Sequence, residues 1–262
     1  MNILTIDTAG PVTALAVSTE QRLIGESFLH TEQQHSERLL PLIEALLKAC
    51  GLRPADLDLV GAACGPGSFT GIRVGIATAQ GMAQALNIPA LGLGALDIVS
   101  WAGWGRPGDI MVLADARKNE WYAARYRWRE EKEPGGGGRW RREVLEAPRV
   151  LAERDLAAQL AAWPAPVWLA GEGAERAGRL AGGAARALPG AAALTRGAYA
   201  ARETREILAA GGLSAVAAQA ADGRRWQIEP YYIRLSAAEA RRQAGGADEP
   251  AAASAPPGLR DE

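Results

Sequence analysis

Three strand-like segments followed by a helix, a strand and a second helix open this chain, and the order then begins again. The strand-like segments are short, rich in Ile, Val, Leu and Thr, and separated by turn residues. We expect strands at 2–8, 12–18, 22–29, 57–65 and 88–96, and helices at 35–51 and 71–86. In the second half we expect strands at 110–116, 120–128, 139–147 and 166–173, and a helix at 150–163. The alternation predicts an α/β fold, and the repeated order indicates two duplicated lobes.

The same order gives the expected domain bounds. We expect an N-terminal lobe that carries partner-binding helices at 1–107, a C-terminal lobe with a closing helix at 108–242, and a disordered low-complexity tail at 243–262. Residues 129–142 contain four consecutive glycines and are expected to form a flexible hairpin tip. Near the end we expect a helix at 198–212, then a strand and a terminal helix within 228–242.

Composition excludes several function classes. The 262 residues carry a formal net charge of −1, and the one basic block is "RWRR" at 139–142, so we expect no direct grip on nucleic acid. The N-terminus begins as a strand rather than a signal peptide, and no run reaches the roughly 18 apolar residues of a membrane span. Two cysteines, Cys50 and Cys64, fit a reducing compartment. We therefore expect a soluble, cytoplasmic protein without membrane association.

The stretch "GPGSFTG" at 65–71 lies between an expected strand and a helix start, where free backbone N–H groups favour an anion. It is not a P-loop, because no lysine follows the last glycine. Its glycines are spaced two and four apart, so it does not fit the dinucleotide pattern G-x-G-x-x-G either. The spacing favours a tight structural turn over an anion site.

The helix after this turn carries a stripe of small residues. Gly71, Gly75, Ala79 and Ala83 recur at every fourth position, and Arg73 is the one charged residue of the helix. A glycine within a helix costs roughly 1 kcal/mol relative to alanine, so a close contact must compensate. Either the second lobe or the terminal helix covers the side of this helix that faces away from its own core, or a second protein chain does. We favour the second chain.

The helix at 35–51 has an equally broad apolar stripe, formed by leucines and Ile43. Two adjacent helices that are apolar on more than one side are typical of half a helical-bundle interface. We expect a partner interface that comprises His35, Leu39, Leu42, Leu46, Gly71, Arg73, Gly75, Ala79 and Ala83.

Metal and nucleophile chemistry find little support in the sequence. His30 and His35 are the two histidines and lie five residues apart, whereas a helical ligand pair needs a spacing of four. Ser68 and Thr70 have no base placed near them, and Cys64 ends an apolar strand, which is typical of a buried, inert thiol. We predict no catalytic residues and no metal site.

Asp7 and Asp115 each follow the first strand of a lobe. Paired carboxylates across an interlobe cleft would suit Mg²⁺ and a nucleotide, although two solvated strand-end carboxylates are the more ordinary interpretation. A phosphate-holding hairpin needs glycine after the aspartate. "DTAGPVT" has one and "DARKNEW" has none, so Asp7 and Asp115 remain weak cofactor-binding candidates.

Five segments together resemble the TsaB (YeaZ) family: "ILTIDTAG", "HSERLLPLI", "GPGSFTGIRVGIATAQGMA", "DARKNEWYAA" and "PYYIRLSAAE". The resemblance runs from residue 1 to about 242 and is densest in the first lobe. It implies a two-lobe fold of the actin/hexokinase/Hsp70 class with duplicated, ribonuclease H-like lobes, of which the second is reduced. It also implies a role in making threonylcarbamoyladenosine in tRNA.

The family role implied is that of a non-catalytic scaffold that activates the transferase TsaD, with the small ATPase TsaE as third component. The resemblance further implies that the first-lobe helices join this chain to TsaD, or to a second copy when TsaD is absent. No cofactor is expected on the chain alone, ATP and Mg²⁺ are expected only at the level of the complex, and tRNA is expected to be contacted indirectly.

Two other hypotheses remain open. An independent ATPase or sugar-kinase-like enzyme would use Asp7 and Asp115. A metalloprotease would need a metal site, which the two histidines do not make.

Overall fold

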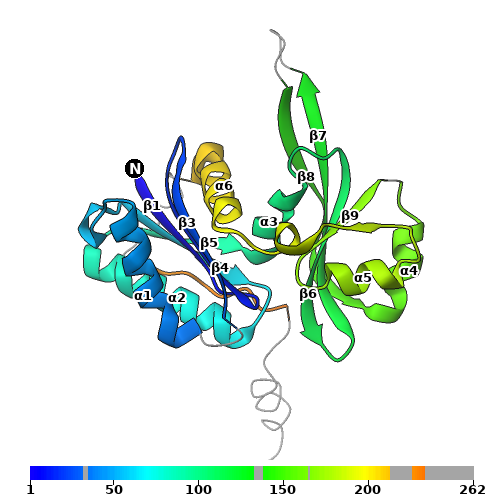
Figure 1. The fold of residues 1–262 in the computed structure, drawn as a ribbon, viewed down its shortest axis with the longest axis horizontal. Helices are drawn as coiled ribbons and strands as arrows, with labels where there is room; N and C mark the ends of the chain where they lie inside the picture. The colour runs from blue at the N-terminus through cyan, green and yellow to red at the C-terminus, as the bar shows by residue number, and fades with distance from the viewer. Residues whose placement is uncertain (32–34, 133–137, 165, 213–225, 234–262) are drawn as a thin grey trace, which may run out of the picture.

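The computed structural model places two five-stranded sheets side by side, each with helices packed against it (Figure 1). It describes residues 1–31, 35–132, 138–164, 166–212 and 226–233. Each sheet has its own large hydrophobic core, so the molecule has two lobes. Over the described ranges no helix has the length and apolar character needed to cross a membrane.

The first sheet has the strand order β3-β2-β1-β4-β5. Its strands are β1 (Asn2–Asp7), β2 (Val12–Thr19), β3 (Leu23–His30), β4 (Leu59–Gly65) and β5 (Ala90–Gly94). The first three form an antiparallel meander, and β4 and β5 run parallel to β1. Because β1 and β2 are buried on both faces, they read as nearly continuous apolar runs. The strands expected before residue 97 are all present.

Helices cover both faces of this sheet. Figure 1 shows α1 (His35–Ala49) and α2 (Phe69–Leu86) on one side and α6 (Gly197–Ile207) on the other. The short helix α3 (Ala95–Ser100) lies between the lobes. At the start of α2, the hydroxyl of Ser68 accepts from the N–H of Gly71, and Asn87 ends the helix in the left-handed conformation (φ 58°).

The second sheet repeats the topology of the first, with the order β10-β9-β6-β7-β8. Its strands are β6 (Gly108–Arg117), β7 (Glu120–Lys132), β8 (Gly138–Ala152), β9 (Val167–Ala170) and β10 (Arg186–Ala187). Its helices α4 (Glu153–Ala161) and α5 (Ala174–Leu180) are shorter than α1 and α2, and β10 has two residues. This confirms the expected duplicated two-lobe architecture with a reduced second lobe.

The prediction that residues 129–142 form a flexible hairpin tip is wrong for both ends of this segment. Strand pairing continues to Lys132 and starts again at Gly138, with Arg129 opposite Arg141 and Glu131 opposite Arg139. Ion pairs between the strands support these ends, with Arg141 lying 3.3 Å from Glu131 and Arg129 lying 3.5 Å from Glu143. Figure 1 shows the hairpin projecting from the second lobe.

After the second sheet the chain returns to the first lobe. Helix α6 packs on β1 and β2, and Gly197 lies so close to the carbonyl of Leu15 that a Cβ there would clash. Trp226 and Ile228 also belong to the first core. A second lobe of residues 108–242 is therefore wrong from Gly197 onward. Residues 228–233 form no strand, contrary to expectation, and the helix expected after them lies outside the described residues.

A buried polar network joins the lobes where β8, α3 and α6 meet. Nη1 of Arg142 donates to the carbonyl of Asp97 and the hydroxyl of Ser100, at 2.8 Å each, and to Oε2 of Glu203 at 2.7 Å. The same Oε2 accepts from the indole of Trp101 at 2.7 Å. The side chains of Arg142 and Glu203 are 13% and 6% exposed, so this interlobe ion pair is largely removed from water.

Candidate functional site

The small-residue stripe of α2 faces its own sheet. A Cβ added at Gly71 would clash with the carbonyl oxygen of Thr8, and one at Gly75 would come within 2.5 Å of the Thr8 hydroxyl. That hydroxyl donates to the carbonyl of Gly71 at 2.7 Å. Ala79 and Ala83 are fully buried. The close contact that the glycines require is therefore made with the end of β1, and these four residues do not form an exposed interface.

The described side chains among the expected interface residues of α1 are also buried or half-buried. Leu39 and Leu46 belong to the first core, and Leu42 is half-buried against it. His35 begins the helix, and its side chain lies outside what the structure describes. The large apolar residue that α1 exposes is Leu40, which is 58% exposed.

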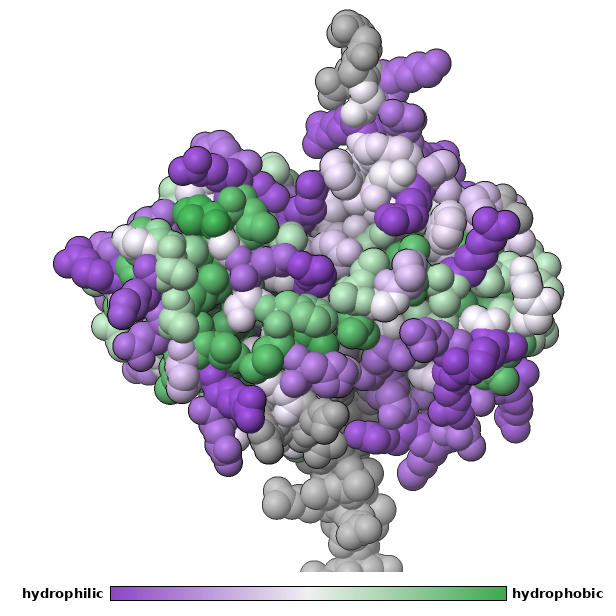
Figure 2. Space-filling view, in the orientation of Figure 1, coloured by the Kyte–Doolittle hydropathy of each residue, from purple (hydrophilic) through white to green (hydrophobic). Residues whose placement is uncertain are grey.

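The outward face of α2 has a second run of small residues. Ala77, Gly81 and Ala85 are exposed at the same four-residue spacing, and a Cβ at Gly81 would meet no atom within 4 Å. Arg73 is exposed at the N-terminal end of this face and is the one charge on the helix. Helix α1 lies beside α2 and exposes Leu40 together with four charged residues, Glu37, Arg38, Glu44 and Lys48. Figure 2 shows hydrophilic residues interspersed with hydrophobic ones over the first lobe.

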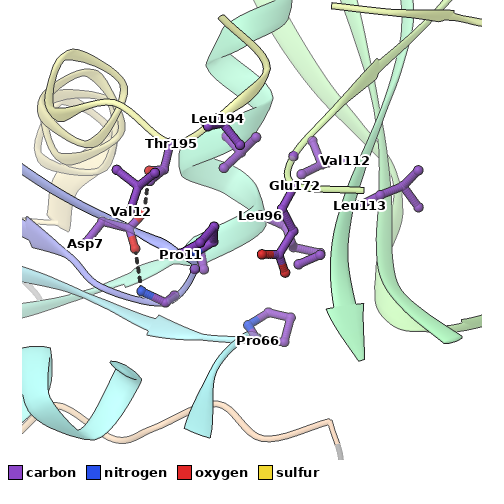
Figure 3. Close-up of a pocket in the computed structure, with 16 residues that line it drawn as sticks. Asp7, Pro11, Val12, Pro66, Leu96, Val112, Leu113, Glu172, Leu194 and Thr195 are labelled. Carbon is purple, nitrogen blue, oxygen red and sulfur yellow. Dashed lines mark hydrogen bonds between the residues drawn. The ribbon is translucent and has the colours of Figure 1, made fainter. Parts of the chain in front are cut away.

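The cleft between the lobes is the second candidate site, and Asp7 lies at its base. This side chain ends β1, is 1% exposed, and accepts from the N–H of Ala9 at 2.9 Å and from the hydroxyl of Thr195 at 2.5 Å. Burial raises the pKa of Asp7, and the bonds from Thr195 and Ala9 oppose that shift. Figure 3 shows these two bonds, and the one from Thr195 ties β1 to the segment leading into α6.

Asp115 lies on the opposite lobe, near the end of β6. Its carboxylate accepts from the backbone N–H of Arg117 at 2.8 Å and lies 3.5 Å from the guanidinium. Its own backbone N–H donates to Glu172 at 2.7 Å, and burial is the main reason why the pKa of Glu172 is raised. The turn that follows holds Arg117, Lys118 and Asn119 at positive φ, where a phosphate-holding hairpin would use glycine.

The structure does not bring the two aspartates into one cavity. Asp7 borders an inner pocket of about 40 Å³ with mainly apolar walls, whereas Asp115 borders an outer cavity of about 860 Å³. Glu172 borders both and points into the space between the lobes (Figure 3). Sequence reasoning missed Glu172, although "GEG" at 171–173 ends an expected strand and was the available signal.

A nucleoside triphosphate does not fit these walls well. The inner pocket, at about 40 Å³, has room for a few water molecules and none for a nucleotide. The outer cavity is large enough and meets the N-terminus of α2, but two carboxylates, Asp115 and Glu172, border it against one cation, Arg117. Among the described residues, no three His, Cys, Asp or Glu side chains are grouped to hold a metal ion that would offset this charge.

Sequence comparison places the chain among known proteins. The family model for TsaD, described as tRNA N6-adenosine threonylcarbamoyltransferase, matches residues 29–241. An uncharacterized protein of Mycobacterium tuberculosis is 41% identical over 126 residues, which are 47% of this chain and 58% of that protein. The tRNA threonylcarbamoyladenosine biosynthesis protein TsaB of Escherichia coli is 35% identical over 159 residues, which are 59% of this chain and 66% of that protein.

Comparison with solved structures gives a match over most of the fold. The structure of YeaZ from Pseudomonas aeruginosa has a TM-score of 0.62 at 23% identity, covering 80% of this chain and 95% of that one. The chain spans 58% and 66% of the two curated relatives named above. Together these matches confirm the resemblance to TsaB (YeaZ) proteins.

Proposed function

This chain belongs to the TsaD family, and from that premise we propose that it serves in making threonylcarbamoyladenosine in tRNA as a non-catalytic, activating subunit. Its partner in this proposal is a TsaD-like transferase, with a TsaE-like ATPase as third component. The substrate is adenosine next to the anticodon, and the role belongs in the cytoplasm, where tRNA is modified.

The outward face of α2, next to Leu40 of α1, is the observation that carries this proposal. Ala77, Gly81 and Ala85 offer small side chains, Leu40 is 58% exposed, and Arg73 is the one charge on α2. An exposed helix side with one charge is better suited to another protein than to water, whereas α1 beside it exposes four charged residues as well as Leu40. The proposed contact is thus the outward face of α2, not the buried stripe Gly71–Ala83 expected from the sequence.

The proposal also assigns self-association, nucleotide binding and tRNA contact. A free chain would use it to pair with a second copy, which TsaD would then replace. The cleft walls favour no triphosphate, so ATP and Mg²⁺ enter this proposal only with the complex. Contact with tRNA is assigned to the partner, because the chain has a net charge of −1.

Co-purification with the TsaD-like transferase of the same genome tests this proposal. Ala77→Arg puts a long charge on the outward face, and we expect it to weaken the complex at least about tenfold and to lower threonylcarbamoyladenosine in tRNA. The matched control is Ala158→Arg, at an exposed alanine of α4 in the other lobe. If Ala77→Arg and Ala158→Arg bind and modify equally well, this surface is not the interface.

An ATPase or kinase acting alone is the second candidate, and one observation favours it. The outer cavity of about 860 Å³ meets the N-terminal turn of an 18-residue helix. Calorimetric titration of the isolated chain with Mg-ATP decides between the two functions. We expect no heat of binding in the micromolar range, whereas tight binding with turnover would establish the enzyme.

A further inference from the structure

The short helix α3 belongs to the hydrophobic cores of both lobes. Ala95 and Ile98 lie in the core of the first lobe, whereas Leu96 and Val99 lie in the core of the second. None of these four residues is more than 8% exposed. Figure 1 shows α3 between the two sheets, where it contacts β4 and β5 of the first sheet and β6 and β7 of the second. If either lobe moved away from α3, a buried apolar face of the helix would be exposed to water.

Polar and aromatic contacts from β7 add to this packing. The hydroxyl of Tyr126 donates to Oδ1 of Asp97 at 3.0 Å, and the indole of Trp128 donates to the carbonyl of Ser100 at 3.0 Å. The ring centres of Trp101 and Trp128 lie 5.0 Å apart. Tyr126 and Trp128 are at most 1% exposed, so these contacts are made inside the protein. The second sheet therefore holds α3, which follows the last strand of the first sheet, by hydrogen bonds as well as by apolar contact.

The chain crosses between the lobes a second time on its way to α6. Ala193 lies in the core of the second lobe and Ala200 in that of the first, and Tyr199 packs against both. Between them, the hydroxyl of Thr195 donates to Asp7 at the end of β1. A hinge needs a few residues that are free to absorb a change of backbone angles. Both crossings are instead packed into a core at each end.

We propose that α3 fixes the two lobes as one rigid body, so that the cleft between them keeps the same width with and without a nucleotide. Rotation about α3 would pull Arg142 away from its acceptors in α3 and α6 and leave Glu203 buried with one donor, which opposes the motion. Packed cores change between discrete arrangements and do not deform gradually.

The rigid connection has two consequences for function. Many enzymes close around a bound substrate to exclude water, and a cleft of fixed width cannot do so. Such a cleft is better suited to a scaffold than to a kinase. In a complex, the second lobe would also keep one position relative to the outward face of α2, so a partner on that face would meet one shape of this chain.

Residual dipolar couplings of the deuterated full chain test the rigid connection. Each lobe yields its own alignment tensor, and the two parts of one rigid body must yield the same tensor. We expect equal magnitude and orientation for the two lobes, with no change when Mg-ATP is added in excess.

A matched pair of core substitutions tests the role of α3. Leu96→Ala and Leu160→Ala both remove a leucine that is at most 2% exposed in the second core, but Leu160 lies in α4. The magnitude of a tensor scales with the square root of the order parameter, which is about 0.85 for rigid and below about 0.6 for flexible structure. We therefore expect Leu96→Ala to lower the tensor of the second lobe relative to the first by at least about 15%, and Leu160→Ala to leave the two equal.

Three results would overturn the proposal. They are unequal or rotated tensors in the wild type with or without Mg-ATP, equal tensors in Leu96→Ala, and the same loss in Leu160→Ala as in Leu96→Ala. If Leu96→Ala does not fold, the wild-type tensors still decide. The proposed function fails separately: tight Mg-ATP binding with turnover, but no change in the orientation of the lobes, would refute the scaffold role and leave the rigid connection in place.

Discussion

The interlobe ion pair gives a quantitative test of what holds the two lobes together. Arg142→Met removes the cation and leaves the carboxylate of Glu203, which is 6% exposed, with the indole of Trp101 as its other donor. Breaking a buried pair in this way costs about 3–5 kcal/mol of the free energy of unfolding. For a chain of this size each kcal/mol corresponds to roughly 2–4 °C, so we expect the melting temperature to fall by roughly 6–20 °C.

A neighbouring arginine on the same strand is the control. Arg141 lies 3.3 Å from Glu131 with exposed fractions of 72% and 51%, so Arg141→Met should cost less than about 1 kcal/mol. A second comparison isolates the charge: adding Glu203→Gln to Arg142→Met should recover part of the loss, because no buried carboxylate is then left unpaired.

Urea denaturation measures all four proteins. Fluorescence of the eight tryptophans reports on tertiary packing, and circular dichroism reports on both sheets. The two probes must give one transition for the free energies to be comparable. If Arg142→Met costs no more than Arg141→Met, or if adding Glu203→Gln increases the loss, the buried pair does not stabilise the contact between the lobes.

Two further predictions concern the first lobe. In urea denaturation, Gly71→Ala should lower the free energy of unfolding by about 1–3 kcal/mol, because its Cβ would clash with the Thr8 carbonyl. Gly81→Ala has open space around it and should raise the free energy of unfolding by up to about 1 kcal/mol. Equal effects would contradict the orientation of α2. Asp7 has a raised pKa in the folded state, so the stability it contributes is complete below its ordinary value of 3.8 and is lost as the pH rises through the raised value. The stability of the wild type relative to Asp7→Asn should therefore fall as the pH rises above about 3.8 in a denaturation series, and a constant difference would contradict burial of the charge.

Much of the fold could be predicted because local patterns specify it. Periods of apolar residues predicted every described strand except β10 and the helices α1, α2, α4 and α6, since each element must bury a face. The four-residue spacing of Gly71, Gly75, Ala79 and Ala83 correctly predicted a close contact for α2. Spacing does not say which neighbour makes that contact. Ala77, Gly81 and Ala85 have the same spacing, and only the position of β1 separates the two faces.

Contacts between residues far apart in the chain could not be predicted from the sequence. Arg142 and Glu203 are 61 residues apart, and neither lies in a pattern that marks it as paired. Asp7 and Asp115 occupy equivalent places in the two lobes, yet the separation of their cavities depends on how the lobes sit against each other. We expected a strand from residue 228 onward, because "PYYIRL" has strand-forming residues. Nothing local shows that the backbone of Tyr231 bonds to the end of β4.

The return of the chain to the first lobe has a consequence for synthesis. The ribosome releases β1 and β2 among the first segments, but α6, which covers one face of those strands, emerges some 180 residues later. Until then, that face of the sheet has no cover from its own chain, and buried residues such as Leu15 lack their native neighbours. The N-terminal lobe cannot therefore be completed vectorially, and a polypeptide released before α6 would present an aggregation-prone sheet to the cell.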